Sequence, residues 1–213
     1  MRGACGPLAA VLACAVASSA PGQALRVRSL IEFRDEGVVR QGLDLTCGAA
    51  AIATLMTYQL GRPVSERAVI VAMLGHTSPA LVRARMGFSL LDLKGYASTR
   101  GLFAAGLGDM SLDDLDARAP AIVPLRWHGF RHFVVYRGRR GDRVLLADPA
   151  FGNRTLSVDA FKSAWVGGIA FIVIDPAYPN APNRLGAPLE LFIHPGAQAQ
   201  RAAITASQIG AGQ

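Results

Sequence analysis

The sequence is short of cysteines and of charge, and it has no apolar stretch long enough to cross a bilayer. Only 17% of its 213 residues are charged and 51% are hydrophobic, which excludes a wholly disordered chain and allows one sizeable core. A membrane span needs about 20 consecutive apolar residues. Metal-ligand spacings such as C-x-x-C or H-E-x-x-H are also missing, so we expect neither a metal ion nor a cofactor.

The net charge of +7 comes almost entirely from arginines that are scattered singly along the chain. One cluster, formed by Arg137, Arg139, Arg140 and Arg143, surrounds the stretch RGRRGDR. A solvated hairpin turn explains this cluster more simply than a phosphate site does. We therefore expect no nucleic-acid partner.

The N-terminus has the pattern of an export signal. One arginine precedes an apolar run at residues 8–17, and SSAPGQA then offers two small-residue cleavage sites, after Ala20 or Ala24. The stretch VLAC also resembles a lipoprotein processing box, which would leave Cys14 lipid-anchored, but the run before it is short. We expect a signal peptide at 1–24, a periplasmic protein and no integral membrane segment in the mature chain.

Removal of this signal would leave Cys47 as the one remaining thiol, because Cys5 and Cys14 precede the cleavage sites. An exported lone thiol is either buried as a small inert side chain or kept for its reactivity. Residues 48–60, GAAAIATLMTYQL, carry no charge and predict a buried helix that Thr46 can cap. Cys47 would then lie in the first turn, where unpaired N–H groups and the helix dipole favour a thiolate.

The chain offers four histidines as a base for this thiol. His76 and His194 lie in loop-like stretches, which hold side chains less rigidly than helices or strands do. His128 precedes the sequence GFR, whereas His132 follows it and opens HFVVYRG, a stretch whose β-branched pair predicts a strand. We therefore select His132 as the general base.

Two further side chains complete a candidate catalytic set. The stretch RVLLADP predicts a second strand after a turn at residues 138–142, and antiparallel pairing would bring Asp148 near His132. Asp148 would then orient the imidazole, although by itself it is typical of a turn before a proline. Gln41 precedes Cys47 by six residues, and its amide could stabilise an oxyanion, although an isolated Gln is more often a surface residue.

The stretches RQGLDLTCGAAAIATLM, HFVVYRG and LLADPAFG resemble the bacteriocin-processing, double-glycine-leader peptidases. The resemblance covers about residues 30–175 and implies an α+β, papain-like fold, with an N-terminal helical layer packed on a C-terminal antiparallel sheet. It also implies that Cys47 is the nucleophile and that His132 is the base and acid. By the same resemblance, Asp148 orients the imidazole and Gln41 donates to the oxyanion.

The chain departs from the best-known members of this family, whose peptidase is the cytoplasmic front end of an ABC exporter. It has no Walker G-x-x-x-x-G-K-[ST] sequence and no transmembrane bundle, but it has an export signal. In that respect, and in MGFSLLDLKGYASTRG, it is similar to stand-alone periplasmic peptidases of Fap-type functional amyloid systems. The similarity implies a polypeptide substrate of an amyloid pathway, cleaved at small residues such as Gly-Gly.

The remaining patterns place helices before strands, an order typical of an α+β domain. Helices are predicted over 64–74, 89–100, 111–118 and 156–165, and strands over 121–127, 132–138, 143–149 and 168–175. From residue 176 the chain is rich in Pro, Ala, Gln and Gly, so we expect a peptidase domain at 25–176 and a flexible tail at 177–213. The apolar run at 189–193 would pack back on the domain or dock a partner.

These predictions together describe an exported cysteine endopeptidase that forms an acyl-enzyme and releases it with water. Two alternatives stay open. A thiol acyltransferase or amidase would use the same residues on the same fold. A peptidase-like binding module would recognise a partner segment without turnover, but it has no reason to keep a thiol at a helix start.

Overall fold

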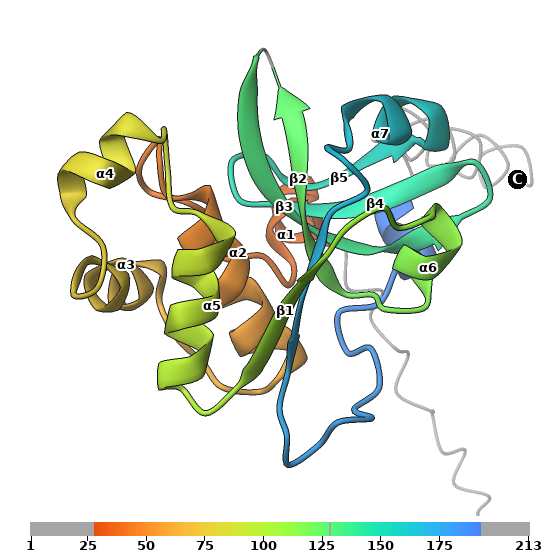
Figure 1. Ribbon diagram of the computed structural model, residues 1–213. Coiled ribbons are helices and arrows are strands. Elements are labelled where there is room, and N and C mark those ends of the chain that lie inside the picture. The colour runs from red at the N-terminus through yellow and green to blue at the C-terminus, as the bar shows by residue number, and fades with distance from the viewer. Residues whose placement is uncertain (1–27, 128, 193–213) are drawn as a thin grey trace, which may run out of the picture.

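In the described part of the chain, which comprises residues 28–127 and 129–192, a group of helices lies beside a six-stranded antiparallel sheet. The structure is a computed structural model, and Figure 1 shows the two layers side by side. The helices come mainly from the first half of the described chain and the strands from the second. This confirms the expected α+β fold class, with an N-terminal helical layer packed on a C-terminal sheet.

Serines start nearly all of the helices. The side chain of an N-terminal serine accepts a hydrogen bond from the third N–H of each of α1, α3, α4, α5, α6 and α7, which fixes where these helices begin. The helices are α1 (Leu30–Asp35), α2 (Cys47–Thr54), α3 (Glu66–Leu74), α4 (Pro79–Ala84), α5 (Leu90–Thr99), α6 (Leu112–Asp116) and α7 (Val158–Ala164).

Helix α2 is buried along its whole length and continues into a π-helical turn, η1 (Leu55–Gln59). The prediction of a buried helix over 48–60 therefore holds, with its start at Cys47. The predicted cap is wrong, however, because the Thr46 side chain makes no capping hydrogen bond to α2 among the described residues. Its hydroxyl donates instead to the carboxylate of Glu66, at the start of α3.

The sheet has the strand order β1-β6-β2-β3-β4-β5. Strands predicted over 121–127, 132–138, 143–149 and 168–175 correspond to β2, β3, β4 and β6, whereas β1 and β5 were not predicted. The predicted helix at 156–165 starts later, because its first two residues belong to β5. The strands are β1 (Phe103–Leu107), β2 (Ala121–Trp127), β3 (Phe130–Arg140), β4 (Arg143–Asp148), β5 (Gly152–Ser157) and β6 (Ala170–Ile174).

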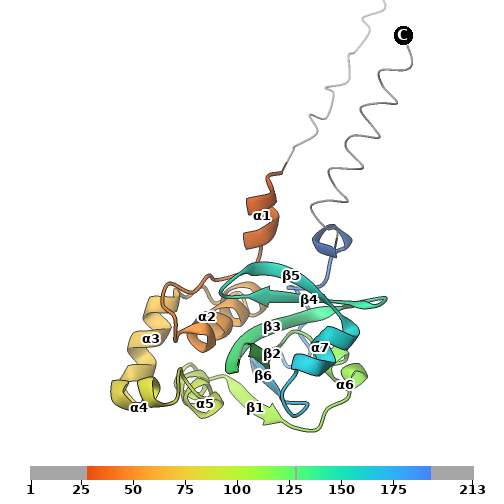
Figure 2. The same cartoon turned by 90° about the horizontal axis from the view of Figure 1, so that it is seen from above.

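Both faces of the sheet are covered, as Figure 2 shows: α2, α3 and α5 lie on one side, and α6 and α7 on the other. Successive residues of β3 therefore enter different cores. Val135 packs with the helical layer, whereas Val134 and Tyr136 pack with α6 and α7. Because both faces of β3 are buried, the strand is held rigidly, and this fixes the position of His132 near its start.

The arginine cluster of the β3–β4 hairpin is only partly the solvated turn that was expected. Arg139 and Arg140 are exposed, but Arg137 is 4% exposed. The Arg137 guanidinium donates to the carbonyl of Leu185 at 2.9 Å and to that of Glu36 at 3.0 Å. Burial lowers the pKa of Arg137 to about 10. This arginine thus joins two distant segments of chain and does not face solvent.

Residues 177–192, assigned above to a flexible tail, contact the domain at several points. Gln59 donates to the carbonyl of Pro182 at 2.9 Å, and Leu185 and Leu191 are buried. The apolar run forms a short 3-10 helix, η2 (Leu189–Phe192), which packs back on the domain. The rest of the expected tail and the expected signal peptide lie outside the described residues, as do His128 and His194. Within the described ranges, no helix has the length and apolarity needed to cross a membrane.

Candidate active site

The start of α2 meets the first residues of β3, and this junction brings Cys47 to His132. The ladder between β3 and β4 ends at the Val135–Ala147 pair, whereas β3 extends beyond it. The N–H of Phe133 is therefore available to the thiol and donates to Cys47 Sγ at 3.5 Å. The His132 ring lies close enough to the Cys47 sulfur for that group to raise the pKa of the imidazole.

The other nitrogen of the imidazole is bound by a buried acid. His132 Nε2 lies 2.7 Å from Oδ1 of Asp148, the last residue of β4, and the Asp148 side chain is completely buried. Nδ1 is therefore the ring nitrogen left to face Cys47. The β3–β4 hairpin thus brings His132 and Asp148 together as the sequence predicts, and α2 brings Cys47 to the same place.

Asp148 keeps its charge in this buried place because each carboxylate oxygen has a donor. Oδ1 accepts a hydrogen bond from the N–H of Ala150 at 2.9 Å in addition to its contact with His132. Oδ2 accepts one from Nε of Arg154 at 2.7 Å. A buried carboxylate without such partners would be strongly destabilising. Sequence reasoning missed Arg154, because it lies on β5, a strand that was not predicted.

The ionisation of the pair follows from these contacts. Burial by itself disfavours the imidazolium, but the hydrogen bond to Asp148 and the proximity of Cys47, with the charges of both groups, raise the pKa of His132 to about 9. Burial would also raise the pKa of Asp148, yet the contact with His132 and the charge of Arg154 keep it below its ordinary value. At neutral pH the pair is therefore an imidazolium held by a carboxylate.

Gln41 lies beside the turn that follows Asp148. Its backbone N–H donates to the carbonyl of Pro149 at 2.9 Å, and its side-chain Nε2 donates to the carbonyl of Leu43 at 3.0 Å. The amide group has two hydrogens, so one stays available. Gln41 Oε1 is buried and has no hydrogen-bond partner among the described residues.

A cleft of about 690 Å³ opens at the thiol, between the helical layer and the sheet. Its lining is largely apolar. Met86, Leu91 and Phe130 line it and are more than half exposed, whereas Cys47 is only 7% exposed. Such a volume is ample for a short stretch of polypeptide.

Outside the cleft, the structure places one further histidine that the sequence analysis considered as a base. His76 is exposed in the turn between α3 and α4. In residues 28–127 and 129–192, no group of His, Cys, Asp or Glu side chains is arranged to hold a metal ion.

Two relatives from Pseudomonas are similar to most of the chain. A protein of Pseudomonas aeruginosa described as "Probable functional amyloid protease FapD" is 39% identical over 153 residues, covering 72% of this chain and 67% of its own length. A protein of Pseudomonas fluorescens with the same description is 37% identical over 179 residues, covering 82% of this chain and 77% of its own.

Solved structures share the fold. A double glycine motif protease from an AMS/PCAT transporter, solved in complex with the leader peptide, is 27% identical with a TM-score of 0.53, covering 64% of this chain and 89% of that one. The peptidase domain of Streptococcus ComA, a bi-functional ABC transporter involved in a quorum sensing pathway, is 23% identical with a TM-score of 0.54, covering 64% and 96%.

These similarities confirm the resemblance to double-glycine-leader peptidases that the sequence motifs indicated. A family model described as the Peptidase C39 family matches residues 35–177, which is more than half of the chain and includes the cleft and the buried pair. The chain therefore belongs to the Peptidase C39 family, and it is a cysteine peptidase.

Proposed function

We propose that Cys47, His132, Asp148 and Gln41 together cleave a polypeptide by acyl transfer. The observation that carries this proposal is the placement of Cys47 beside His132, which is bound to buried Asp148 at 2.7 Å, with the cleft open at the sulfur. A nucleophile, a base and a group that orients the base are the parts that such chemistry needs.

In the first half of the reaction, His132 holds the proton drawn from Cys47, and the Sγ thiolate attacks the carbonyl carbon of the scissile bond, whose electrons move onto the carbonyl oxygen. The free hydrogen of Gln41 Nε2 and the N–H of Cys47 stabilise this oxyanion. His132 then gives its proton to the departing amine nitrogen, the C–N bond breaks and an acyl-enzyme remains. Asp148 holds the imidazole throughout and stabilises its charged form.

In the second half, a water molecule gives a proton to His132 and attacks the thioester carbon. The oxyanion forms again and collapses, the C–S bond breaks, and the product leaves as a carboxylic acid. His132 and Cys47 return to their starting ionisation. These reaction steps need no cofactor, because the water supplies both the nucleophile and the proton.

The substrate that fits this cleft is an extended polypeptide with small residues at the cleaved bond. The apolar walls around Met86, Leu91 and Phe130 suit the apolar side chains of such a segment. Because Cys47 is 7% exposed, a bulky residue would have to displace its neighbours to bring its carbonyl to the sulfur. The double glycine motif protease with its leader peptide supports the same preference.

We further propose that the enzyme acts in the periplasm on a protein of a functional amyloid pathway. The two Pseudomonas relatives support the pathway. The pattern of an export signal at residues 1–24 supports the compartment. Alkaline phosphatase fused behind residue 24 is expected to be active in a bacterial host, because that enzyme requires oxidised disulfides. A fusion active only after cell lysis in oxidising buffer contradicts the proposal.

The substrate class is tested with synthetic peptides that differ only at one central pair of residues. Three 20-residue peptides with an apolar and acidic sequence would carry Gly-Gly, Ala-Ala or Leu-Leu at the centre, and products would be identified by mass spectrometry. We expect cleavage after the pair, fastest for Gly-Gly and slowest for Leu-Leu, and none with Cys47→Ala. Undiminished cleavage by Cys47→Ala would falsify the mechanism.

The same assay separates the alternatives. Products that appear only when hydroxylamine or another amine is added would identify an acyltransferase. Tight binding of the peptides without any turnover by the wild-type protein would identify a binding module.

A further inference from the structure

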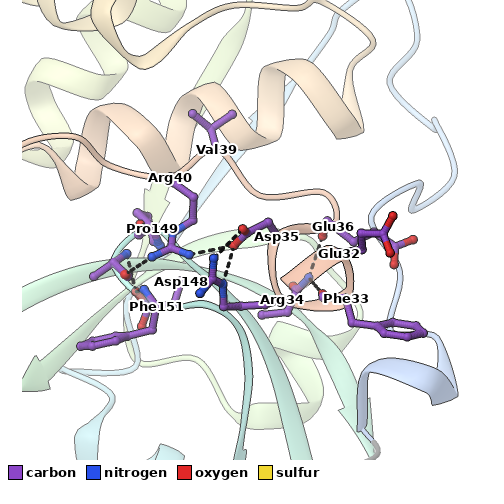
Figure 3. Close-up of polar contacts among 12 residues, drawn as sticks. Glu32, Phe33, Arg34, Asp35, Glu36, Val39, Arg40, Asp148, Pro149 and Phe151 are labelled. Atoms are coloured by element: carbon purple, nitrogen blue, oxygen red, sulfur yellow. Dashed lines mark hydrogen bonds and ion pairs between the residues drawn. The ribbon is translucent and has the colours of Figure 1, made fainter. Parts of the chain in front are cut away.

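The segment that joins α1 to α2 runs between the nucleophile helix and the turn that follows Asp148, and Figure 3 shows the contacts of its Arg40. On one side, the N–H of Val39 donates to Oγ1 of Thr54 in the nucleophile helix at 2.9 Å. On the other side, the N–H of Gln41 donates to the carbonyl of Pro149. Between these two lies Arg40, whose side chain points toward the turn after Asp148 (Figure 3).

Arg40 binds this turn with two of its nitrogens. Nε donates to the carbonyl of Pro149 at 3.1 Å, and Nη2 donates to the carbonyl of Ala150. The carbonyl of Pro149 thus accepts from both the Arg40 side chain and the Gln41 backbone. The same turn is closed from within, because Asp148 Oδ1 accepts from the N–H of Ala150.

The third nitrogen of Arg40 faces away from the turn. Nη1 forms an ion pair of 2.7 Å with Asp35, and Asp35 also holds the guanidinium of Arg34 at 2.8 Å (Figure 3). The hydrogen bond from Arg34, with further help from Arg40, lowers the pKa of Asp35 to about 2. Asp35 is therefore charged at any working pH, and it holds the fork of Arg40 in one orientation.

We propose that Arg40 is a positioning residue for the reaction. It locks the segment that carries Gln41 onto the turn that follows Asp148, and it thereby fixes the oxyanion donor relative to the catalytic pair. This inference rests on the proposed function, in which Gln41 donates to the oxyanion. Arg40 does not line the cleft and acts through its neighbour.

Arginine is the residue type that this position needs. A guanidinium has five N–H donors in a rigid plane, so one side chain can bind two successive carbonyls and a carboxylate at the same time. A lysine ammonium is a single point that cannot span these three acceptors in fixed directions. A small error in the placement of a catalytic group costs as much as about 100-fold in rate.

The test compares two reactions of the same thiol. Peptide cleavage passes through an oxyanion, whereas alkylation of Cys47 by iodoacetamide needs the thiolate alone. For Arg40→Met we expect kcat for the Gly-Gly peptide to fall about 10- to 100-fold, with KM within about twofold. The alkylation rate and its pH profile should stay within about twofold of wild type, because the Cys47, His132 and Asp148 contacts do not include Arg40.

Two further variants complete the series. Arg34→Met is the matched control, because it removes a guanidinium that binds the same carboxylate and for which no hydrogen bond to residues 149–151 is seen in the described chain, and it should cleave within about twofold of wild type. Gln41→Ala should lose about 100-fold in kcat. The double variant Arg40→Met with Gln41→Ala should lose less than the product of the two single losses, since both act on one donor.

The outcomes are decisive in either direction. Wild-type kcat in Arg40→Met, fully multiplicative losses in the double variant, or alkylation that falls in step with cleavage would each overturn the positioning role. Should Arg40→Met prove insoluble, Arg40→Lys retains the charge and the contact with one carbonyl, and its kcat should lie between that of the wild type and that of Gln41→Ala. The proposed function fails separately, if Cys47→Ala still cleaves the peptide.

Discussion

The two sides of the active site are held in opposite ways. On the side of the base, Asp148 is completely buried and compensated by the charged partners His132 and Arg154. On the side of the oxyanion donor, Arg40 and Asp35 keep about a third of their side chains exposed, and backbone carbonyls are the main acceptors. The comparison indicates a division of labour. Buried charge sets the ionisation of the base, and Arg40 with Asp35, here called the outer clamp, sets the position of Gln41.

Removal of the buried acid should have the largest effect. Asp148→Ala leaves His132 and Arg154 without their carboxylate, and breaking a buried pair costs about 3–5 kcal/mol. Asp35→Ala breaks ion pairs whose side chains are a third to a half exposed, and surface pairs contribute about 0–1 kcal/mol. Urea unfolding of both variants measures the difference. Equal losses of unfolding free energy would refute the contrast between the two sides.

The second prediction concerns pH and the same buried side. The pKa of His132 is raised from 6.5 to about 9, so its charged form stabilises the fold by about 3 kcal/mol. This stabilisation is fully present below pH 6.5 and is lost as the pH rises through about 9. The unfolding free energy of the wild type should therefore fall between pH 6.5 and 9.5.

His132→Gln is the control for that titration. Its unfolding free energy should show a flatter dependence over the same range, because glutamine does not titrate. The outer clamp supplies the complementary check, since Asp35 is charged throughout this range and Arg40→Met should follow the wild-type slope. A slope that is the same in wild type and His132→Gln would show that another group titrates.

The buried side could be predicted from the sequence because its signals are local. The β-branched alternation after His132, the turn and the run before Asp148 predict one hairpin, and a hairpin sets which residues face each other. The uncharged run after Cys47 predicts a buried helix in the same way. The assignment of catalytic roles needed the family resemblance, since a lone residue of each of these types more often has no part in catalysis.

The outer clamp could not be predicted, because its partners lie about a hundred residues apart and only the fold brings them together. Arg154 was missed for a different reason: GNRTLS is a half-buried edge strand with polar side chains, which lacks a clear alternation. Helix α1 had a usable signal in the capping box of Ser29 and Glu32. Helix α4 also had one, in a serine followed by a proline at its first position.

The third prediction separates charge from position within the buried side. Arg154→Met removes a hydrogen bond to a charged group, which costs about 1.5–3 kcal/mol. It also removes a cation that lies near the imidazolium, so the pKa of His132 should rise further. The basic limb of the pH profile of kcat/KM should then move to higher pH. Arg40→Met should lower kcat without moving that limb, and a shift in both variants would contradict the division of labour.

The smallest effect is expected outside both sides, on the wall of the cleft. Leu91 is 75% exposed and lines the cleft, so Leu91→Ser should change the unfolding free energy by less than about 0.5 kcal/mol. It should raise KM for the Gly-Gly peptide about fivefold, because the lost apolar contact is worth about 1 kcal/mol. Because Leu91 belongs to neither the buried pair nor the clamp, kcat should stay unchanged.

Val71→Ser is the matched control for that variant, since Val71 is 64% exposed on α3 and does not line the cleft. It should leave both KM and kcat at their wild-type values. A rise in KM in both variants would mean that the substrate follows α3 and not the cleft. A fall of kcat in Leu91→Ser would mean that the wall helps to place the scissile bond, so that position is set from three sides and not from the outer clamp alone.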